Sequence, residues 1–501
     1  MDSVKKLKMN TAASFIQRFV IILYGLILPR LIISYYGAEV HGLTTSINQF
    51  LSIITFLDLG IGPVIQSYLY RPLANNDTTQ VSLILSSAKS YFRKLSYILV
   101  GYIILLMIVY PLIIDQPSSS ISIAFLIFAM SINQFAQYYF GIINELLLNA
   151  DQKSYIQYGS EIIVVILNLL ASIFLITQGV SIQILKLSTS LIYLIRPIYL
   201  NYYVNKNYNI DIDIEVTEDP IPQRWNGIAQ HVSWFIQSST DIVILTLFST
   251  LNQVSIYSVY NMIVQAVRTV ITSLTNELTP FFGNLLAKSE LIQLKNYFTK
   301  VEWIVHTGVI YLFGMTAVLI NPFVKLYTIG IEDVNYYAPL FSFILVLAHT
   351  IYSFRAPYQL LIFAAGHYKQ TQVSSIIEAL INVSVSALLV NQLGLVGIAI
   401  GTFCALAYRT IYLVFYLSKN IINRPIKMFV KQVIVDLITF GTMITIGIIV
   451  FQFIEIDTIL SWVITAVIFG IVFAIITFGY NFLFYQDNLL DFLKRFQRKS
   501  K

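Results

Sequence analysis

Several basic side chains of this sequence lie inside long apolar stretches, where charge is rare. They are Arg18, Arg30, Lys186, Arg196, Arg268, Arg355 and Arg409. If these stretches cross a membrane, exposing one such side chain to lipid costs about 2.5–3.5 kcal/mol, or on the order of 20 kcal/mol for all of them. We therefore expect most of them to face protein, water or headgroups. Because a guanidinium group binds phosphate through paired hydrogen bonds, the arginines indicate a phosphate-bearing anionic ligand.

Four arginines are candidates for direct ligand binding, namely Arg18, Arg30, Arg268 and Arg355. Arg268 is the leading one because it lies near the middle of its predicted span. Each has a structural alternative. Arg18 and Arg30 are close enough to the membrane interfaces to extend into them, and Arg355, beside Pro357, has acids such as Glu302 as possible partners. For Arg196 and Arg409, which lie nearer the cytoplasmic ends, we favour structural pairing.

Polar side chains follow one face of several predicted helices. At about 100° per residue, Asn261, Gln265 and Arg268 share a narrow sector. The same holds for Asn48 with its neighbours and for the stripe that contains Gln237. A single Ser, Asn or Gln more often joins helices by hydrogen bonds than binds a ligand. Whole stripes in both halves of the chain favour a hydrophilic central cavity, so we take Asn48, Gln237, Asn261 and Gln265 as substrate-binding candidates.

Asp58 and Asp241 lie near the middle of predicted spans, where a carboxylate is a candidate site for a coupling Na⁺ or H⁺. Structural pairing with an arginine is the alternative that we favour for both. The histidines lack metal-ligand spacing, there is one cysteine, Cys404, and no phosphate-binding Gly-rich loop precedes a Lys-Ser or Lys-Thr pair. We therefore expect no metal, no cofactor and no catalytic residues, and we predict that the protein is not an enzyme.

The elements that position these residues follow from composition. Of 501 residues 57% are hydrophobic and 11% charged, against roughly a quarter charged in a soluble domain. Since a span needs about 20 apolar residues, the chain divides into about 14 spans and predicts an all-α integral membrane protein. The expected spans are 11–36, 42–70, 88–114, 121–148, 155–178, 180–204, 225–250, 254–283, 298–327, 336–365, 370–392, 394–420, 426–452 and 458–485.

The distribution of lysine and arginine predicts the orientation. Nearly all basic residues outside the spans fall in alternate loops and at the two termini, and only Lys325 falls on the other side. The positive-inside rule then places both termini in the cytoplasm. Because the basic residues are spread over many short loops and form no patch, we expect no nucleic-acid partner.

Short matches recur at an offset of 213 residues, with Arg196-Pro-Ile-Tyr-Leu200 matching Arg409-Thr-Ile-Tyr-Leu413 and Asn48 matching Asn261. Such a repeat over six helices predicts two pseudo-symmetric lobes of like orientation. The expected organisation is an N-lobe at 1–204, a cytoplasmic linker at 205–224, a C-lobe at 225–420, and two extra C-terminal helices with a basic tail at 421–501. For the acidic linker we favour a simple solvated tether.

Several motifs resemble those of the polysaccharide and oligosaccharide-lipid flippases (Wzx-type) of the MOP exporter superfamily. They are Tyr36-Gly37-Ala38-Glu39 with Gly42-Leu43, Leu57-Asp58-Leu59-Gly60-Ile61-Gly62, Tyr70-Arg71-Pro72-Leu73-Ala74, and Ala364-Ala365-Gly366 before Lys369. The resemblance implies a two-lobed protein of the bacterial cytoplasmic membrane that carries an undecaprenyl-diphosphate-linked oligosaccharide outward by alternating access. Family members use basic cavity residues, for which Arg18, Arg30 and Arg268 are the matching positions. Membrane lipids and other polysaccharide-assembly proteins are the expected partners.

Two alternatives remain open. A multidrug cation exporter of the same superfamily is expected to have about 12 spans and an acidic cavity, which the arginines argue against. A membrane glycan polymerase or ligase, from a different class, resembles this chain in hydropathy but carries a large extracytoplasmic loop. The longest loop expected on that side, 322–335, is short.

Overall fold

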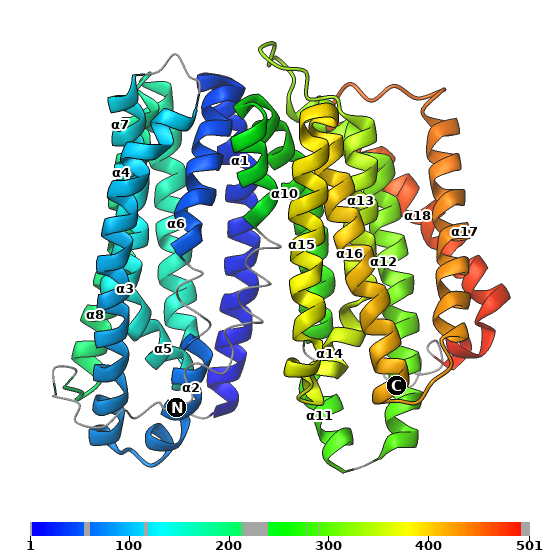
Figure 1. Ribbon diagram of the computed structural model, residues 1–501, viewed down its shortest axis with the longest axis horizontal. Helices are drawn as coiled ribbons and strands as arrows, with labels where there is room; N and C mark the ends of the chain where they lie inside the picture. Colours follow the sequence, from blue (N-terminus) through cyan, green and yellow to red (C-terminus); the bar gives the residue numbers. More distant parts are fainter. Residues whose placement is uncertain are drawn as a thin grey trace. The chain divides into compact units, whose positions relative to one another are not determined.

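The computed structural model describes residues 3–54, 61–114, 119–211, 214, 239–276, 278–288 and 290–491, which form helices and no strand. The first half of the chain forms α1 Ser3–Ser52, α2 Ile61–Ala74, α3 Thr78–Ile113, α4 Ser120–Ala136, a π-helix Gln137–Gly141, α5 Ile142–Ala150, α6 Ser154–Thr177, α7 Ile182–Tyr193, α8 Ile195–Asn207 and a helix Ser239–Phe248. The second half forms α10 Leu251–Asn276, α11 Thr279–Ala287, α12 Leu291–Tyr327, α13 Pro339–Phe354, α14 Ala356–Ala364, α15 Tyr368–Leu393, α16 Leu395–Asn420, α17 Lys427–Val450 and α18 Ile459–Phe484 (Figure 1).

Eleven of the helices in the described ranges are long and apolar enough to cross a membrane, so the chain is a multi-pass membrane protein. The difference from the predicted 14 has local causes. The expected span 11–36 and the first part of span 42–70 both lie in α1, and the rest of the described part of span 42–70 lies mainly in α2. Span 180–204 is divided between α7 and α8, and span 225–250 is described only from residue 239. The count of 14 stays a prediction.

Gly37 divides α1 into two helices. Its φ of 87° and ψ of 168° lie outside the helical region, and the positive φ is one that glycine adopts at little cost. The candidate span that includes Gly37, Lys8–Ser52, has 45 residues, more than twice the length that one crossing requires. The chain therefore breaks where the sequence predicts its first turn.

Two compact units, Met1–Leu247 and Phe248–Lys501, make up the molecule. The boundary lies inside the expected span 225–250, and most of the expected linker lies outside the described residues. The helix bounds repeat at the offset of 213 residues: α3 begins at Thr78 and α12 at Leu291, while α7 begins at Ile182 and α16 at Leu395. The same packing recurs, because α3 contacts α4 as α12 contacts α13, and α4 contacts α7 as α13 contacts α16.

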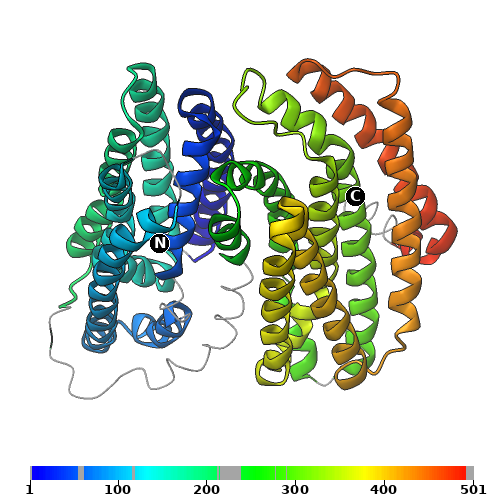
Figure 2. The same cartoon turned by 45° about the horizontal axis from the view of Figure 1, so that its top comes forward.

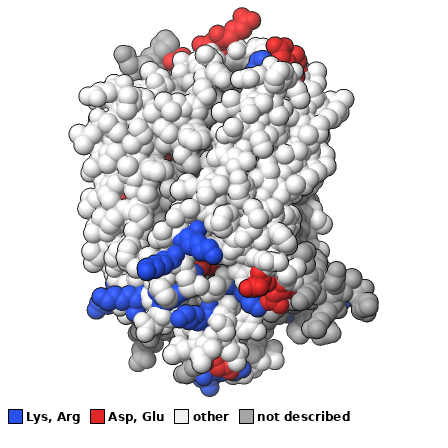
Figure 3. Space-filling view, turned by 90° about the vertical axis from the view of Figure 1, so that its right-hand side faces the viewer, with Lys and Arg blue, Asp and Glu red and all other residues white. Residues whose placement is uncertain are grey.

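In the second unit, α17 and α18 lie beyond this repeat and pack against α12 (Figures 1 and 2). One end of the unit carries lysines at the start of α12, the end of α16 and the start of α17, and we call it the lysine-rich end. The loops at the opposite end carry Glu332, Asp333, Glu455 and Asp457. Figure 3 shows one face of the molecule, on which charged groups gather at the two ends, with most of the Lys and Arg at one of them and an almost uncharged band between. Such a band is typical of a surface in contact with lipid.

An ion-pair cluster closes the corresponding end of the first unit. Asp151, between α5 and α6, accepts hydrogen bonds from Lys6 of α1 at 3.0 Å and from the Tyr208 hydroxyl at 2.5 Å, and Lys153 lies 2.7 Å away. Burial alone would raise the pKa of Asp151, but its bonds to Lys153, Tyr208 and Lys6 together lower that pKa below its ordinary value. The cluster ties the start of α1 to the α5–α6 turn.

Candidate functional site

Three arginines gather around one glutamate inside the second unit. Arg355 lies in the break between α13 and α14, where Pro357 begins the new helix, and its Nη1 donates to Glu378 Oε1 of α15 at 2.5 Å. From α16, Arg409 Nε lies 3.7 Å from Glu378 Oε2. Arg355 is 3% exposed and Glu378 4%, so this is a buried ion pair. The sequence analysis gave pairing with an acid such as Glu302 as the structural alternative for Arg355; Arg355 does pair with an acid, but that acid is Glu378, and Glu302 pairs with Arg424.

Arg268 of α10 completes the arginine cluster through an aromatic ring. Its guanidinium carbon lies 3.5 Å from the centre of the Tyr352 ring, and that of Arg355 lies 4.1 Å from the same ring. Cations this close to a ring face are attracted by its quadrupole, which partly offsets the repulsion between them. Tyr352, one turn before the helix break, therefore holds the two guanidinium groups near each other.

The described part of the arginine cluster has three guanidinium groups and one carboxylate. Among the described residues, Glu378 is the only acid within ion-pair distance of Arg355 or Arg409. Guanidinium groups gathered in this way offer paired hydrogen-bond donors, so the arrangement is suited to an oxyanion.

Further polar groups adjoin the arginine cluster. Asn261 and Gln265 lie on α10 with Arg268, all three are partly exposed, and the Gln265 amide donates to Asn261 Oδ1 at 3.4 Å. His349, one turn before Tyr352, is 4% exposed, and its Nδ1 has no hydrogen-bond partner among the described residues. The structure thus brings four of the sequence-predicted residues, Asn261, Gln265, Arg268 and Arg355, into one unit.

The other candidates belong to the first unit. Arg18 and Asn48 are exposed on α1, Arg30 is partly exposed, and Asp241 is buried in the helix Ser239–Phe248. Arg18 and Arg30 are 12 residues apart on α1, or about 18 Å along a helix axis, too far apart to hold one phosphate between them. Asp58 and Gln237 lie outside the described residues.

The first unit contains an equivalent of Arg409. Arg196 of α8, at the repeat offset, lies 2.9 Å from Glu145 and 3.5 Å from Glu161. In each unit, an arginine on the last helix of the repeat thus pairs with an acid on an earlier helix. In the first unit two carboxylates lie near the one guanidinium group of Arg196. The repeat match of Arg196 with Arg409 was the sequence signal for this shared role. No local feature of the sequence identified Tyr352 as a neighbour of Arg268, or Glu378 as a neighbour of Arg409.

A second buried network joins α12 to α14, to the loop before α17 and to α17. Glu302 pairs with Arg424 and accepts a hydrogen bond from the Tyr358 hydroxyl. One turn later, His306 Nδ1 lies 2.6 Å from Asp436 Oδ2 of α17. These contacts fix α12 against α17.

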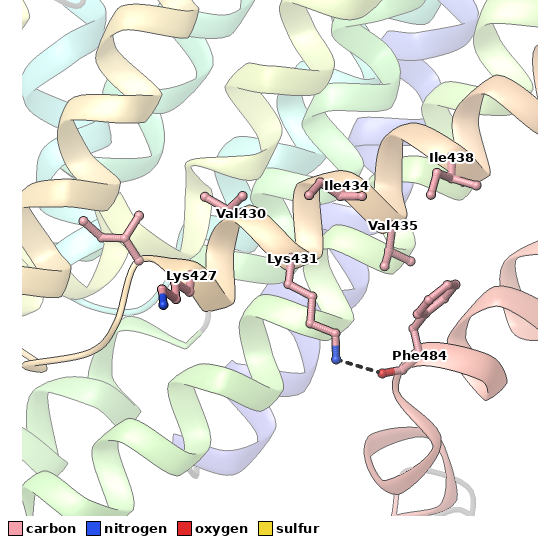
Figure 4. A pocket seen from close by; sticks show the side chains of 8 residues that line it. Lys427, Val430, Lys431, Ile434, Val435, Ile438 and Phe484 are labelled. Carbon is pink, nitrogen blue, oxygen red and sulfur yellow. Dashed lines mark hydrogen bonds between the residues drawn. The ribbon is translucent and has the colours of Figure 1, made fainter.

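A lipid-facing groove runs along α17 toward the end of α18 (Figure 4). Val435, Ile438 and Phe484 line it, and the Lys431 ammonium group donates to the Phe484 carbonyl oxygen at 3.3 Å. Apart from Lys427 and Lys431 at its lysine-rich end, its lining is apolar. The groove is therefore separate in character from the arginine cluster.

Two helical units with the same internal packing, and eleven helices among the described residues that are long and apolar enough to cross a membrane, define the class of this fold, that of a polytopic all-α membrane protein. Comparison of the sequence with protein-family models and with curated proteins gives no match. Comparison with solved structures gives strong matches. The lipid II flippase MurJ in an inward closed conformation is 17% identical, with a TM-score of 0.65, and the match covers 95% of this chain and 99% of that one.

Transporters of the multidrug resistance MATE family, of the MOP superfamily, are also similar. An inward-facing structure gives a TM-score of 0.58 at 14% identity, covering 84% of this chain and 99% of that one. An outward-facing structure gives 0.53 at 14% identity, covering 83% and 95%. The chain therefore has the fold shared by MurJ and the MATE transporters.

Proposed function

We propose that this protein is a flippase that moves an undecaprenyl-diphosphate-linked oligosaccharide from the inner to the outer leaflet of a bacterial cytoplasmic membrane, for surface polysaccharide synthesis. The observation that carries the proposal is the gathering of three guanidinium groups, those of Arg268, Arg355 and Arg409, in one buried cluster. A diphosphate supplies the matching negative charge, and each guanidinium group can bind it through two hydrogen bonds.

The fold supports this proposal over the alternatives. The match with the lipid II flippase extends over 95% of the chain, while the matches with the MATE transporters extend over 83–84%. The gathered guanidinium groups of the arginine cluster would repel a cationic drug. A glycan polymerase is disfavoured because the loops between α12 and α13 and between α17 and α18 are too short for a catalytic segment.

In the proposed mechanism the two lobes give the headgroup access to alternate sides of the membrane, with both termini in the cytoplasm. Arg268 and Arg355 bind the diphosphate, and the amides of Asn261 and Gln265 adjoin it on α10. Arg18, Arg30 and Asn48 of the first lobe are proposed as further contacts. Asp58 and Asp241 are the proposed sites for a coupling Na⁺ or H⁺, which would supply the energy for uphill transport.

The test is transport of a fluorescent undecaprenyl-diphosphate-linked oligosaccharide across the bilayer of proteoliposomes. We expect Arg268→Ala to abolish transport while insertion and folding persist, because Arg268 is partly exposed and forms its contact with a ring. Arg268→Lys should recover part of the rate, since it keeps the charge but loses the paired hydrogen bonds.

Lys295→Ala, at the lysine-rich end, is the matched control for loss of one positive charge and should leave transport unchanged. Wild-type transport by Arg268→Ala would remove Arg268 from the site. Transport of a drug cation in place of the lipid would establish the alternative function.

A further inference from the structure

A polar cavity of about 600 Å³ opens at the end of the second unit opposite the lysines. The start of α10, the start of α13 and the turn between α15 and α16 form its walls. Its polar lining comes mainly from Ser249, Gln253, Asn391 and Gln392. Among the described residues no charged side chain lines it, in contrast to the arginine cluster of the same unit.

Gln253 is held at the cavity wall by the shape of the neighbouring turn. Gly394 has a φ of +54°, and a Cβ atom added there would lie 2.9 Å from Gln253 Oε1 and 3.1 Å from Nε2. The side-chain amide therefore occupies space that only a glycine leaves open. Its Oε1 is buried and has no hydrogen-bond partner among the described residues. A buried acceptor of this kind costs about 1–3 kcal/mol until a donor reaches it.

The opposite wall is fixed by a network of hydroxyl groups. Tyr260 donates to the Tyr336 carbonyl oxygen at 2.9 Å and accepts from the Ala338 amide at 3.1 Å, and Ser255 lies 2.7 Å from the Tyr336 hydroxyl. These bonds tie the loop before α13 to α10. The cavity is thus formed in advance, which lowers the entropy cost of binding.

We propose that this cavity binds uncharged sugar units of the transported glycan. A side-chain amide both donates and accepts, which matches the hydroxyl groups of a sugar. The apolar lining from Phe248, Leu340 and Leu393 provides contact for the C–H faces of the ring. Because the described lining of the cavity is uncharged, it favours neither an anion nor a cation. The inference depends on the proposed function and adds a second subsite to the diphosphate site.

The experiment measures binding to the full-length protein in nanodiscs with two probes, undecaprenyl diphosphate alone and the same lipid carrying a neutral oligosaccharide. We expect wild type to bind the glycosylated lipid more tightly. Gln253→Leu and, separately, Asn391→Leu should weaken binding of the glycosylated lipid about tenfold, or ~1.4 kcal/mol, and leave the bare lipid unaffected. Gln452→Leu, an exposed amide in a different cavity at the same end, is the matched control.

The outcomes separate this inference from the proposed function. If wild type binds both lipids equally, or if Gln253→Leu and Asn391→Leu both bind the glycosylated lipid as wild type does, the sugar cavity is refuted while the flippase stands. An equal loss for the two lipids would show that the substitution acts through folding and would also refute the cavity. If wild type binds neither lipid, the proposed function fails, and the inference fails with it.

Discussion

Replacing Glu378 by glutamine tests the positive charge of the arginine cluster directly. The substitution keeps the shape of the side chain and removes the one carboxylate that lies 2.5 Å from Arg355 and 3.7 Å from Arg409. The arginine cluster then carries three positive charges with no carboxylate partner among the described residues. We expect the folded state to lose stability and the affinity for anions to rise.

The size of the effect follows from burial. Glu378 is 4% exposed, and breaking a buried ion pair by removing one partner typically costs about 3–5 kcal/mol. Inorganic pyrophosphate that binds the folded arginine cluster would restore about 2.7 kcal/mol at a concentration one hundred times its Kd. We therefore expect pyrophosphate to raise the Tm of Glu378→Gln by more than it raises that of wild type.

The assay is thermal unfolding of the purified protein in detergent, followed by tryptophan fluorescence over a range of pyrophosphate concentrations. Asp436→Asn is the matched control, because Asp436 is also 4% exposed but pairs with His306 in a separate network, away from the arginine cluster. It should lose stability without any gain from pyrophosphate. Equal responses of the two variants to pyrophosphate would refute the assignment of an anion site to the arginine cluster.

Two further predictions concern packing and pH. Gly401→Ala should destabilise the protein by about 1–3 kcal/mol, because the new Cβ on α16 would lie 2.8 Å from the backbone nitrogen of Ser386 on α15. Gly441→Ala, at a position with open space around it, is the control and should be neutral or stabilising. Equal Tm values of the two variants in thermal unfolding would contradict this prediction. Because the pKa of Asp151 is lowered in the folded state, the unfolded chain binds the Asp151 proton more tightly than the folded chain does. The stability that Asp151 contributes should therefore be present above its ordinary pKa of 3.8 and lost as the pH falls through its pKa in the folded state. Asp151→Asn should flatten the acid limb of a stability-against-pH curve, and an unchanged acid limb would contradict the assigned role.

Hydropathy predicted much of the helical architecture, because each span must satisfy its backbone within an apolar run. The breaks at Gly37 and Gly394 were predictable from glycine at the ends of apolar runs. The division of the expected span 180–204 between α7 and α8 was not predictable from the sequence. No glycine lies at this division, and Pro197, which follows it, lies inside α8. The π-helix Gln137–Gly141 has no local sequence signature either.

The candidate site was only partly predictable. The cost of burying charge singled out Arg268 and Arg355, and helical periodicity placed Asn261 and Gln265 with Arg268. The partner of Arg355 depends on how α14 and α15 pack, which periodicity within one helix cannot reveal. For the same reason the sequence could name Glu302 only as an example of a possible acid partner, and Glu302 pairs with Arg424 instead.

The central claim is that the arginine cluster binds the phosphate groups of a lipid carrier. The most direct measurement is a cryo-electron microscopy structure of the protein with an undecaprenyl-diphosphate-linked oligosaccharide. We predict phosphate density within hydrogen-bonding distance of Arg268 and Arg355. A bound headgroup located elsewhere, with the arginine cluster unchanged around Glu378, would contradict it.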